Sequence, residues 1–408
     1  MPNNTRPSSM RIAFKTLALL SYTSCTLLAG SQSFAALEPL ERTTTTTAIL
    51  PTTYDDLAGH KAQVIFTATP HLPYTSHGQQ NKLAASTFAH KSCLTEHPPR
   101  ADIAQGYCEL TRLDDDFITT AAQIKAKISK ERHPLFLWRY QRGSTTVYLG
   151  GSIHILKAGL HPLPAQFQQA FDATEKLVLE VDLSRYTPQE LQFKTMQYAL
   201  LAKGQQLPAV LQQDTYAALS SATAEYGLSL AQMSQFKPGF ITQQLAVLAL
   251  MAVGYNPAEG MENHFTTQAD DKEILQLETL DFQLDLLMNQ PLATQEEMTR
   301  DMLGQMDSFE PYTAELVGAW LAGDDAAFKA AFDAQSGTTE AIRAFMFNLL
   351  DKRNQGMAKK IAEYLRGEGQ YLVLIGAAHY VGEGSIIKLL EKMGFIGQRI
   401  FSDQNINQ

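Results

Sequence analysis

The chain has 408 residues, of which 45% are hydrophobic and 18% are charged. This apolar share excludes a chain that is disordered throughout, and the length suits about two or three domains. With 33 Lys and Arg against 42 Asp and Glu, the net charge of −9 argues against a nucleic-acid-binding surface, which needs a basic footprint. Three Cys cannot build a disulfide-dependent scaffold in so long a chain.

The N-terminus has the pattern of a secretory signal peptide over residues 1–35. Basic residues and no acidic one precede an apolar stretch at 16–29, and Ser33-Phe34-Ala35 provides the small residues of a cleavage site. The stretch is shorter than the roughly 20 residues of a permanent membrane helix, although a retained anchor is the alternative. Translation from Met10 would give a more compact signal. We therefore expect an exported protein, periplasmic or secreted, with no transmembrane span after cleavage.

Cleavage of the signal peptide would change both the charge and the cysteine count. It would leave 30 basic residues against 42 acidic ones, a net charge of −12, and two cysteines, Cys93 and Cys108. Two cysteines in an exported protein can pair, and the short loop between them makes such a bond worth about 3 kcal/mol in chain-entropy terms. We predict this disulfide, and the alternative is two buried free thiols.

The composition divides the remaining chain into three parts. Residues 36–53 contain an unbroken threonine run and read as a linker, and residues 54–130 read as a small accessory domain. The strand and helices expected in that domain lie at 64–67, 82–90 and 118–128. A larger domain is predicted over residues 131–405.

From residue 134 onward, short apolar runs alternate with longer amphipathic stretches, a pattern typical of an α/β fold. The predicted strands are Thr146–Leu149, Leu177–Val181, Ile274–Leu277 and Tyr371–Ile375. The predicted helices cover residues 188–201, 213–226, 240–253, 294–307, 312–321, 325–334 and 338–365. We expect a small central β-sheet surrounded by many helices.

Each predicted strand leads into a residue that can take part in chemistry. The first and fourth strands continue into Gly-x-x-His motifs that end at His154 and His379, and the second and third lead into Glu180 and Glu278. Ligands of open α/β sheets bind outside the carboxyl ends of the strands, so we expect these side chains to converge on one cleft. A single histidine after a strand is more often structural, but the matched pair with two glutamates favours a functional site. The repeated motif also suggests two pseudo-symmetric halves.

A series of ordered motifs occurs between residues 135 and 401. They are Gly151-Ser152-Ile153-His154 with Pro162-Leu163-Pro164, Leu179-Glu180-Val181-Asp182, Gly260-Met261-Glu262, Leu277-Glu278-Thr279 with Gln283, Arg353-Asn354 with Met357-Ala358, and Gly376-Ala377-Ala378-His379 with Gly382. In this order and spacing they resemble the TraB/GumN family, whose animal relatives are the Tiki metalloproteases. No single motif is specific, and residues 36–130 lie outside the resemblance.

The resemblance implies a metal site formed by His154, Glu180 and His379. Imidazole and carboxylate groups bind Mn²⁺, Co²⁺ or Zn²⁺, and water bound to such an ion becomes a nucleophile when its pKa falls to about 7. In the Tiki branch these residues support a metal-dependent peptidase. A distant and similarly built group, the erythromycin esterases, implies an alternative in which a comparable His/Glu/His set activates water without an obligatory metal.

The predicted catalytic residues are Glu180, Glu278 and Arg353. Glu180 would be a metal ligand or a general base, and Glu278 a second carboxylate. Arg353 would stabilise an oxyanion or hold a substrate carboxylate, and its alternative is a solvated position on a lysine-rich helix.

Taken together, these patterns predict an exported, peptidase-like hydrolase that acts on a peptide or a small-molecule amide or ester. The alternative is a non-catalytic protein that sequesters a peptide or small factor in the same cleft.

Overall fold

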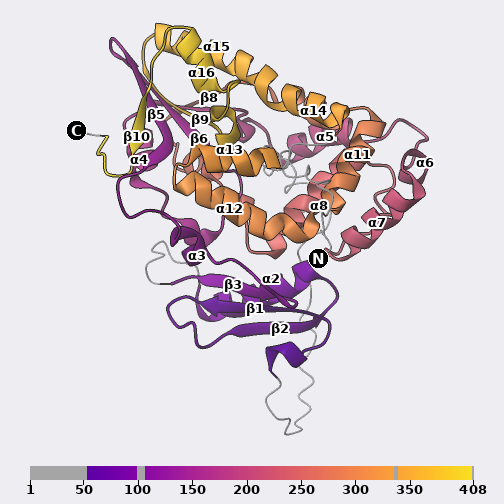
Figure 1. Ribbon diagram of the computed structural model, residues 1–408. Coiled ribbons are helices and arrows are strands. Elements are labelled where there is room, and N and C mark those ends of the chain that lie inside the picture. The colour runs from indigo at the N-terminus through magenta and orange to yellow at the C-terminus, as the bar shows by residue number, and fades with distance from the viewer. Residues whose placement is uncertain (1–52, 99–105, 335–338, 407–408) are drawn as a thin grey trace, which may run out of the picture.

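The computed structural model describes residues 53–98, 106–334 and 339–406. The predicted signal peptide and nearly all of the predicted linker lie outside these residues. The described chain contains two β-sheets and many helices, which confirms the α/β prediction (Figure 1). Among the residues that are described, no helix is long and apolar enough to cross a membrane.

The first part of the chain, which we call the N-terminal unit (residues 53–98 and 106–130), contains a four-stranded antiparallel sheet in the order β2-β1-β3-β4. Its elements are β1 (His60–Phe66), β2 (Tyr74–Gln79), α2 (Lys82–Glu96), β3 (Cys108–Leu113), β4 (Asp116–Phe117) and α3 (Ala121–Lys125). A disulfide joins Cys93 of α2 to Cys108 of β3, as predicted. The α2 helix is longer than the sequence predicted, and α3 is shorter.

The larger part contains a six-stranded sheet in the order β10-β5-β6-β9-β7-β8. Its strands are β5 (Pro134–Arg142), β6 (Thr145–Ser152), β7 (Lys176–Leu179), β8 (Glu273–Gln276), β9 (Gln370–Gly376) and β10 (Gln398–Phe401). The four predicted strands are β6, β7, β8 and β9, which are parallel neighbours, and the prediction missed β5 and β10. All residues of β6 are buried, because helices cover both faces of the centre of the sheet.

Helices make up most of the remaining chain. In chain order they are α4 (Ala165–Asp172), α5 (Pro188–Ala199), α6 (Leu207–Val210), α7 (Gln213–Ala224), α8 (Pro238–Ala252), α9 (Met261–Thr266), α10 (Leu280–Met288), α11 (Leu292–Leu303), α12 (Phe309–Leu321), α13 (Asp325–Ala334), α14 (Glu340–Phe347), α15 (Arg353–Arg366) and α16 (Ile386–Lys392). Most of the predicted helices match one of these. The long helix predicted at 338–365 is present as α14 and α15, which run on through a π-helical turn at Asn348–Lys352.

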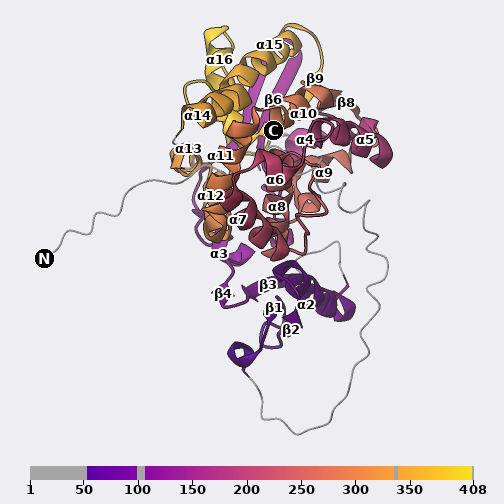
Figure 2. The same cartoon turned by 90° about the vertical axis from the view of Figure 1, so that its right-hand side faces the viewer.

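The N-terminal unit packs against the larger part through helices. Its α2 contacts α8, and its α3 contacts α12 and the short helix η4 (Ala158–Leu160), as Figures 1 and 2 show from two directions. One continuous apolar core includes Val64 and Leu110 of the N-terminal unit together with Trp320 and Leu374 of the larger part. The boundaries predicted for a separate accessory domain, and the pseudo-symmetry of the larger one, stay predictions.

Candidate functional site

The parallel strands place the four predicted residues in a row at one edge of the sheet. His154 follows β6, His379 lies in the short helix η9 (Ala377–Tyr380) after β9, Glu180 follows β7, and Glu278 comes just after β8. Because the spatial order of these strands is β6-β9-β7-β8, the two histidines lie on one side of the row and the two glutamates on the other. The sequence had predicted this meeting at the carboxyl ends of the strands.

Arg353, the first residue of α15, lies among these side chains. Its Nη2 donates a hydrogen bond to Oε2 of Glu180 at 2.5 Å and another to Oε2 of Glu278 at 2.7 Å. Its Nε donates to both oxygens of Glu278 at 3.0 Å. The residue is only 4% exposed, so the alternative of a solvated basic face is wrong for Arg353. The guanidinium fork suits this bridging of two carboxylates.

Further donors complete the surroundings of the two carboxylates. The backbone N–H of Gly376 donates to Oε1 of Glu180 at 2.8 Å. The side-chain amide of Gln283 donates to Glu180 and to Glu278, at 3.2 and 3.1 Å. The backbones are joined too, since the N–H of Glu278 donates to the carbonyl of Glu180 at 2.8 Å. Buried carboxylates need such partners to stay ionised.

The charges in this cluster strongly shift the pKa of Glu180. Burial alone would raise it, but the Arg353 guanidinium, supported by the Gly376 N–H, lowers the pKa of Glu180 from 4.5 to about 2. Burial would likewise lower the pKa of Arg353, but Glu180 and Glu278 raise it above its ordinary value. Glu180 is therefore ionised and Arg353 is charged at neutral pH.

His379 is fully buried and held by a neighbouring amide. Its Nδ1 lies 2.5 Å from Oδ1 of Asn354, whose Nδ2 donates to the carbonyl of Gly384 at 2.9 Å. With the amide oriented in this way, His379 carries its proton on Nδ1 and directs the Nε2 lone pair at Nη1 of Arg353, 3.4 Å away. Burial, helped by the charge of Arg353, lowers the pKa of His379 to about 3 against the opposing effect of Glu180. His379 is therefore neutral at physiological pH.

His154 is paired with a carboxylate of its own. Its Nδ1 lies 2.8 Å from Oε1 of Glu262, and the hydroxyl of Ser152 donates to the same oxygen. Burial would lower the pKa of His154, but Glu262, through its charge and this hydrogen bond, raises it above its ordinary value, and Glu180 adds to the effect. The side chain is 13% exposed, in contrast to the fully buried His379.

A close backbone approach aligns His154 with Glu262. A Cβ on Gly260 would lie 2.1 Å from the carbonyl oxygen of His154, so only glycine lets the two segments come this close. The N–H of Met261 also donates to the carbonyl of Ile153 at 3.1 Å. This pairing explains physically why a Gly-Met-Glu segment accompanies the first Gly-x-x-His motif.

The geometry does not fit a metal ion held by His154, Glu180 and His379. Both oxygens of Glu180 already accept hydrogen bonds, and the guanidinium of Arg353 occupies the space between Glu180 and His379 that an ion would need. Within the described ranges, no three His, Cys, Asp or Glu side chains are placed to hold one metal ion. Metal ligation by these residues stays a prediction that this arrangement does not support.

Two cavities flank the cluster. One, of about 580 Å³, is lined by Glu278 and Arg353 together with residues of α10, the π-helical turn and α15. The other, of about 410 Å³, is lined by Asn354 and Ala378, which adjoin His379. Two members of the charged cluster therefore lie in the wall of the first cavity, where a ligand would be next to them.

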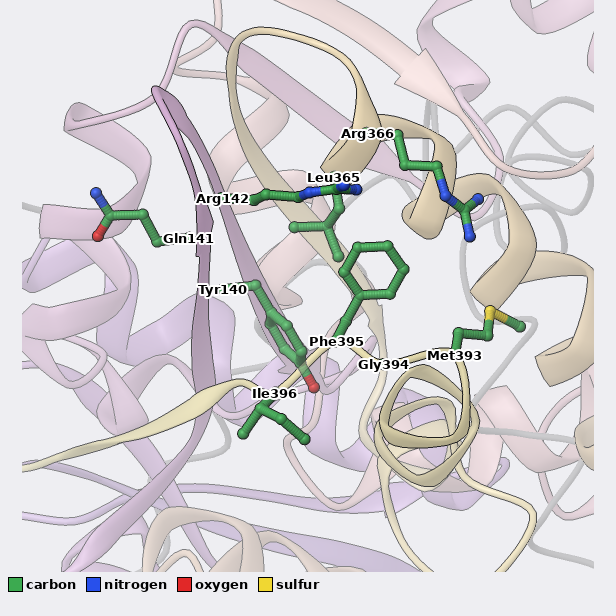
Figure 3. A pocket seen from close by; sticks show the side chains of 9 residues that line it. All are labelled: Tyr140, Gln141, Arg142, Leu365, Arg366, Met393, Gly394, Phe395 and Ile396. Atoms are coloured by element: carbon green, nitrogen blue, oxygen red, sulfur yellow. The ribbon is translucent and has the colours of Figure 1, made fainter.

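A further cavity, of about 420 Å³, lies at the opposite end of the strands and is shown in Figure 3. It is lined by Arg142 at the end of β5 and Arg366 at the end of α15, and both guanidinium groups lie near the ring of Phe395. Because β5 is antiparallel to β6, these residues lie away from the row of histidines and glutamates. The cavity is therefore separate from the candidate site.

A model of the TraB/PrgY/gumN family matches residues 136–399, well over half of the chain. The chain belongs to the TraB/PrgY/gumN family. This match, which confirms the resemblance seen in the motifs, includes all four strand-end residues and Arg353, and it leaves the N-terminal unit outside. Comparisons with curated proteins and with solved structures found no match to this chain.

The sequence did not assign roles to three residues that complete the site: Glu262, Gln283 and Asn354. All three stand in the motifs that carry the family resemblance, which was the signal available for finding them. Their roles as partners of His154, the two glutamates and His379 depend on distant segments and emerge only in three dimensions.

Proposed function

We propose that this TraB/PrgY/gumN protein is an exported hydrolase that cleaves an amide or ester bond, with a peptide as the leading substrate class. The observation that carries the proposal is the row of His154, His379, Glu180 and Glu278 at the carboxyl ends of parallel strands, beside a cavity lined by Glu278 and Arg353. Convergent charged and titratable groups with strongly shifted pKa values are typical of active sites.

His154 is the proton carrier in this proposal. Its side chain is 13% exposed, although its Nε2 is buried, whereas His379 is fully buried. The carboxylate of Glu262 beside Nδ1 raises the pKa of His154, and such a pairing favours a histidine that takes a proton from water and returns it to the leaving group. Glu262 holds the imidazole and stabilises its charged form, as carboxylates do for catalytic histidines.

Glu180, Arg353 and Glu278 form a fixed array of charges rather than proton carriers. Glu180, with a pKa of about 2, is too weak a base to exchange protons efficiently near pH 7. Arg353 lies in the wall of the cavity and holds both carboxylates in place, while its Nη1 donates to the carbonyl of Leu349 and faces His379. No step of this proposal passes through a metal ion.

The test is hydrolysis of a library of internally quenched fluorescent peptides by the purified protein. We expect turnover that persists with EDTA, that falls roughly 100-fold or more in His154→Asn and Glu262→Gln, and that His77→Asn leaves unchanged. His77 is an exposed histidine of β2, which makes it a control for the same substitution outside the row. Peptide binding without turnover would reject the hydrolase and favour the sequestering protein. Turnover abolished by EDTA and restored by Mn²⁺, Co²⁺ or Zn²⁺ would reject the metal-free arrangement.

Export is part of the proposal and has its own test. We expect the chain, expressed with its native N-terminus in a Gram-negative host, to be recovered from the periplasm with Ala36 as its first residue. Recovery of the uncut chain from the membrane fraction would instead indicate a retained anchor.

A further inference from the structure

The loop that carries His154 is held from two sides. On one side, the backbones of Leu156 and Asn256 exchange hydrogen bonds of 3.3 and 2.8 Å, which joins the loop to the segment leading to Glu262. On the other side lies the N-terminal unit, which is outside the family match. Figures 1 and 2 show α3 of this unit directly between its sheet and the larger part.

Lys157, three residues after His154, is the first contact with the N-terminal unit. It is 3% exposed, and its Nζ donates to the carbonyl of Thr119 at 2.6 Å. Glu310 of α12 accepts hydrogen bonds from the N–H and hydroxyl of the same threonine, at 2.9 and 3.3 Å, and lies 3.9 Å from Nζ of Lys157. A buried ammonium and a partly buried carboxylate thus both converge on one threonine, and such a network loses stability if any member moves.

Tyr107 makes the closest contact. A Cβ on Gly159 would lie 2.3 Å from the phenol ring of Tyr107, so the ring lies directly on the backbone of the loop. The Tyr107 hydroxyl donates to Glu109 at 3.3 Å, and Glu109 accepts from the N–H of Ala121 at 2.5 Å. The tyrosine is therefore held from within the N-terminal unit, next to disulfide-bonded Cys108.

A third contact lies further along the loop, where Nζ of Lys125 in α3 donates to the carbonyl of His161 at 3.1 Å. The loop between β6 and α4 is therefore contacted by the N-terminal unit at Lys157, Gly159 and His161. Loops have few internal hydrogen bonds, so external contacts of this kind decide how precisely a loop residue is placed.

We propose that the N-terminal unit is a positioning device for the active site, in which Tyr107 and Lys157 hold the loop that aligns His154 with Glu262. This inference rests on the proposed role of His154. A displacement of about 1 Å at a catalytic group can cost roughly 100-fold in rate, so the unit contributes to turnover without contacting the substrate. Tyr107 and Lys157 act through His154 and are positioning residues.

The test uses the full-length protein and a compensating pair of substitutions. Tyr107→Ala removes the ring from the loop, and Gly159→Val forces a side chain into the ring. The double variant Tyr107→Ala/Gly159→Val removes the clash, because the space left by the ring accepts the valine. Tyr74→Ala, which alters a tyrosine of β2 that bonds Glu96, is the matched control.

Two measurements are compared: hydrogen exchange of the amides at 153–164, and kcat and KM on a peptide cleaved by the wild type. We expect exchange about tenfold faster and kcat at least tenfold lower with KM unchanged in each single variant, and recovery of both to within about threefold in the double variant. Tyr74→Ala should leave both unchanged.

Three outcomes would overturn the proposal. They are unchanged exchange at 153–164 in both single variants, faster exchange with unchanged kcat, and equal losses in Tyr74→Ala. If the wild type cleaves no peptide, the proposed function fails, and hydrogen exchange alone decides whether the N-terminal unit holds the loop.

Discussion

Arg353 is the centre of the charged cluster, and Arg353→Met should destabilise the protein in a pH-dependent way. The substitution keeps most of the aliphatic volume but leaves Glu180 and Glu278 buried without a counter-charge. Breaking a buried pair by removing one partner typically costs about 3–5 kcal/mol. The lowering of the pKa of Glu180 from 4.5 to about 2 corresponds to about 3 kcal/mol of stability at neutral pH, in agreement with that range.

The sign of the pH dependence follows from which form of Glu180 the folded protein prefers. In the wild type the pKa is lowered on folding, so its contribution is fully present above pH 4.5 and is lost as the pH falls towards 2. Without Arg353, burial dominates and raises the pKa of Glu180 above 4.5, so the folded variant takes up a proton in mild acid. The destabilisation should therefore be smaller at pH 5 than at pH 7, by about 1 kcal/mol or more.

Urea unfolding followed by tryptophan fluorescence at both pH values measures these differences. Lys352→Met is the matched control, because Lys352 is the preceding residue, is exposed, and should change stability by less than about 0.5 kcal/mol. Arg353→Lys should lie between the wild type and Arg353→Met, since one ammonium cannot bridge both carboxylates. A loss below about 1 kcal/mol in Arg353→Met, or an equal loss at both pH values, would refute the reasoning.

Three further predictions concern other parts of the molecule. The pKa of His379 is lowered from 6.5 to about 3, so the contribution of His379 to stability should fall by about 1.4 kcal/mol per pH unit between pH 6.5 and 3, and urea titrations of His379→Asn should lack this contribution. Cys93→Ser/Cys108→Ser should cost about 3 kcal/mol in the same assay, and a variant equal to the oxidised wild type would contradict this. Gly356 faces open space in the cavity of about 580 Å³, so Gly356→Trp should fold normally and block peptide turnover. The control Gln355→Trp should leave turnover unchanged. Full turnover in Gly356→Trp would exclude this cavity as the entrance for the substrate.

The central strands could be predicted because short runs of apolar residues mark them in the sequence. Strands β6, β7 and β9 are almost wholly buried, β8 is a partly buried edge strand, and all four read as short apolar runs. Their parallel order brings the following residues together. Both β8 and β10 are four-residue edge strands, but the run at Ile274–Leu277 has three apolar residues, whereas β10 begins with Gln398 and Arg399 and has only two. Its partner β5 pairs with it across more than 250 residues, a relation that no local pattern contains.

The position of Arg353 shows where local composition misleads. The lysines around it, such as Lys352 and Lys359, are exposed and suggested a solvated basic helix face. Arg353, Met357 and Ile361 are all buried and recur every four residues, so they form the inner stripe of α15. The helical spacing therefore already indicated that Arg353 is buried, although the number of lysines around it suggested an exposed position. The carboxylates that Arg353 contacts follow β7 and β8, and no local sequence pattern shows which ones they are.

In the proposed hydrolase, the charge balance of the site favours one histidine for proton transfer. Arg353 keeps Glu180 ionised far below neutral pH, and the buried surroundings keep His379 neutral, so neither changes protonation near pH 7. His154 differs because Glu262 opposes the effect of burial and raises its pKa. A catalytic proton carrier must be able to take up a proton, and His154 is the histidine of the row whose pKa is raised rather than lowered. The N-terminal unit contacts the loop of His154 at Lys157 and Gly159. The alignment of His154 therefore depends on a part of the chain that lies outside the family match.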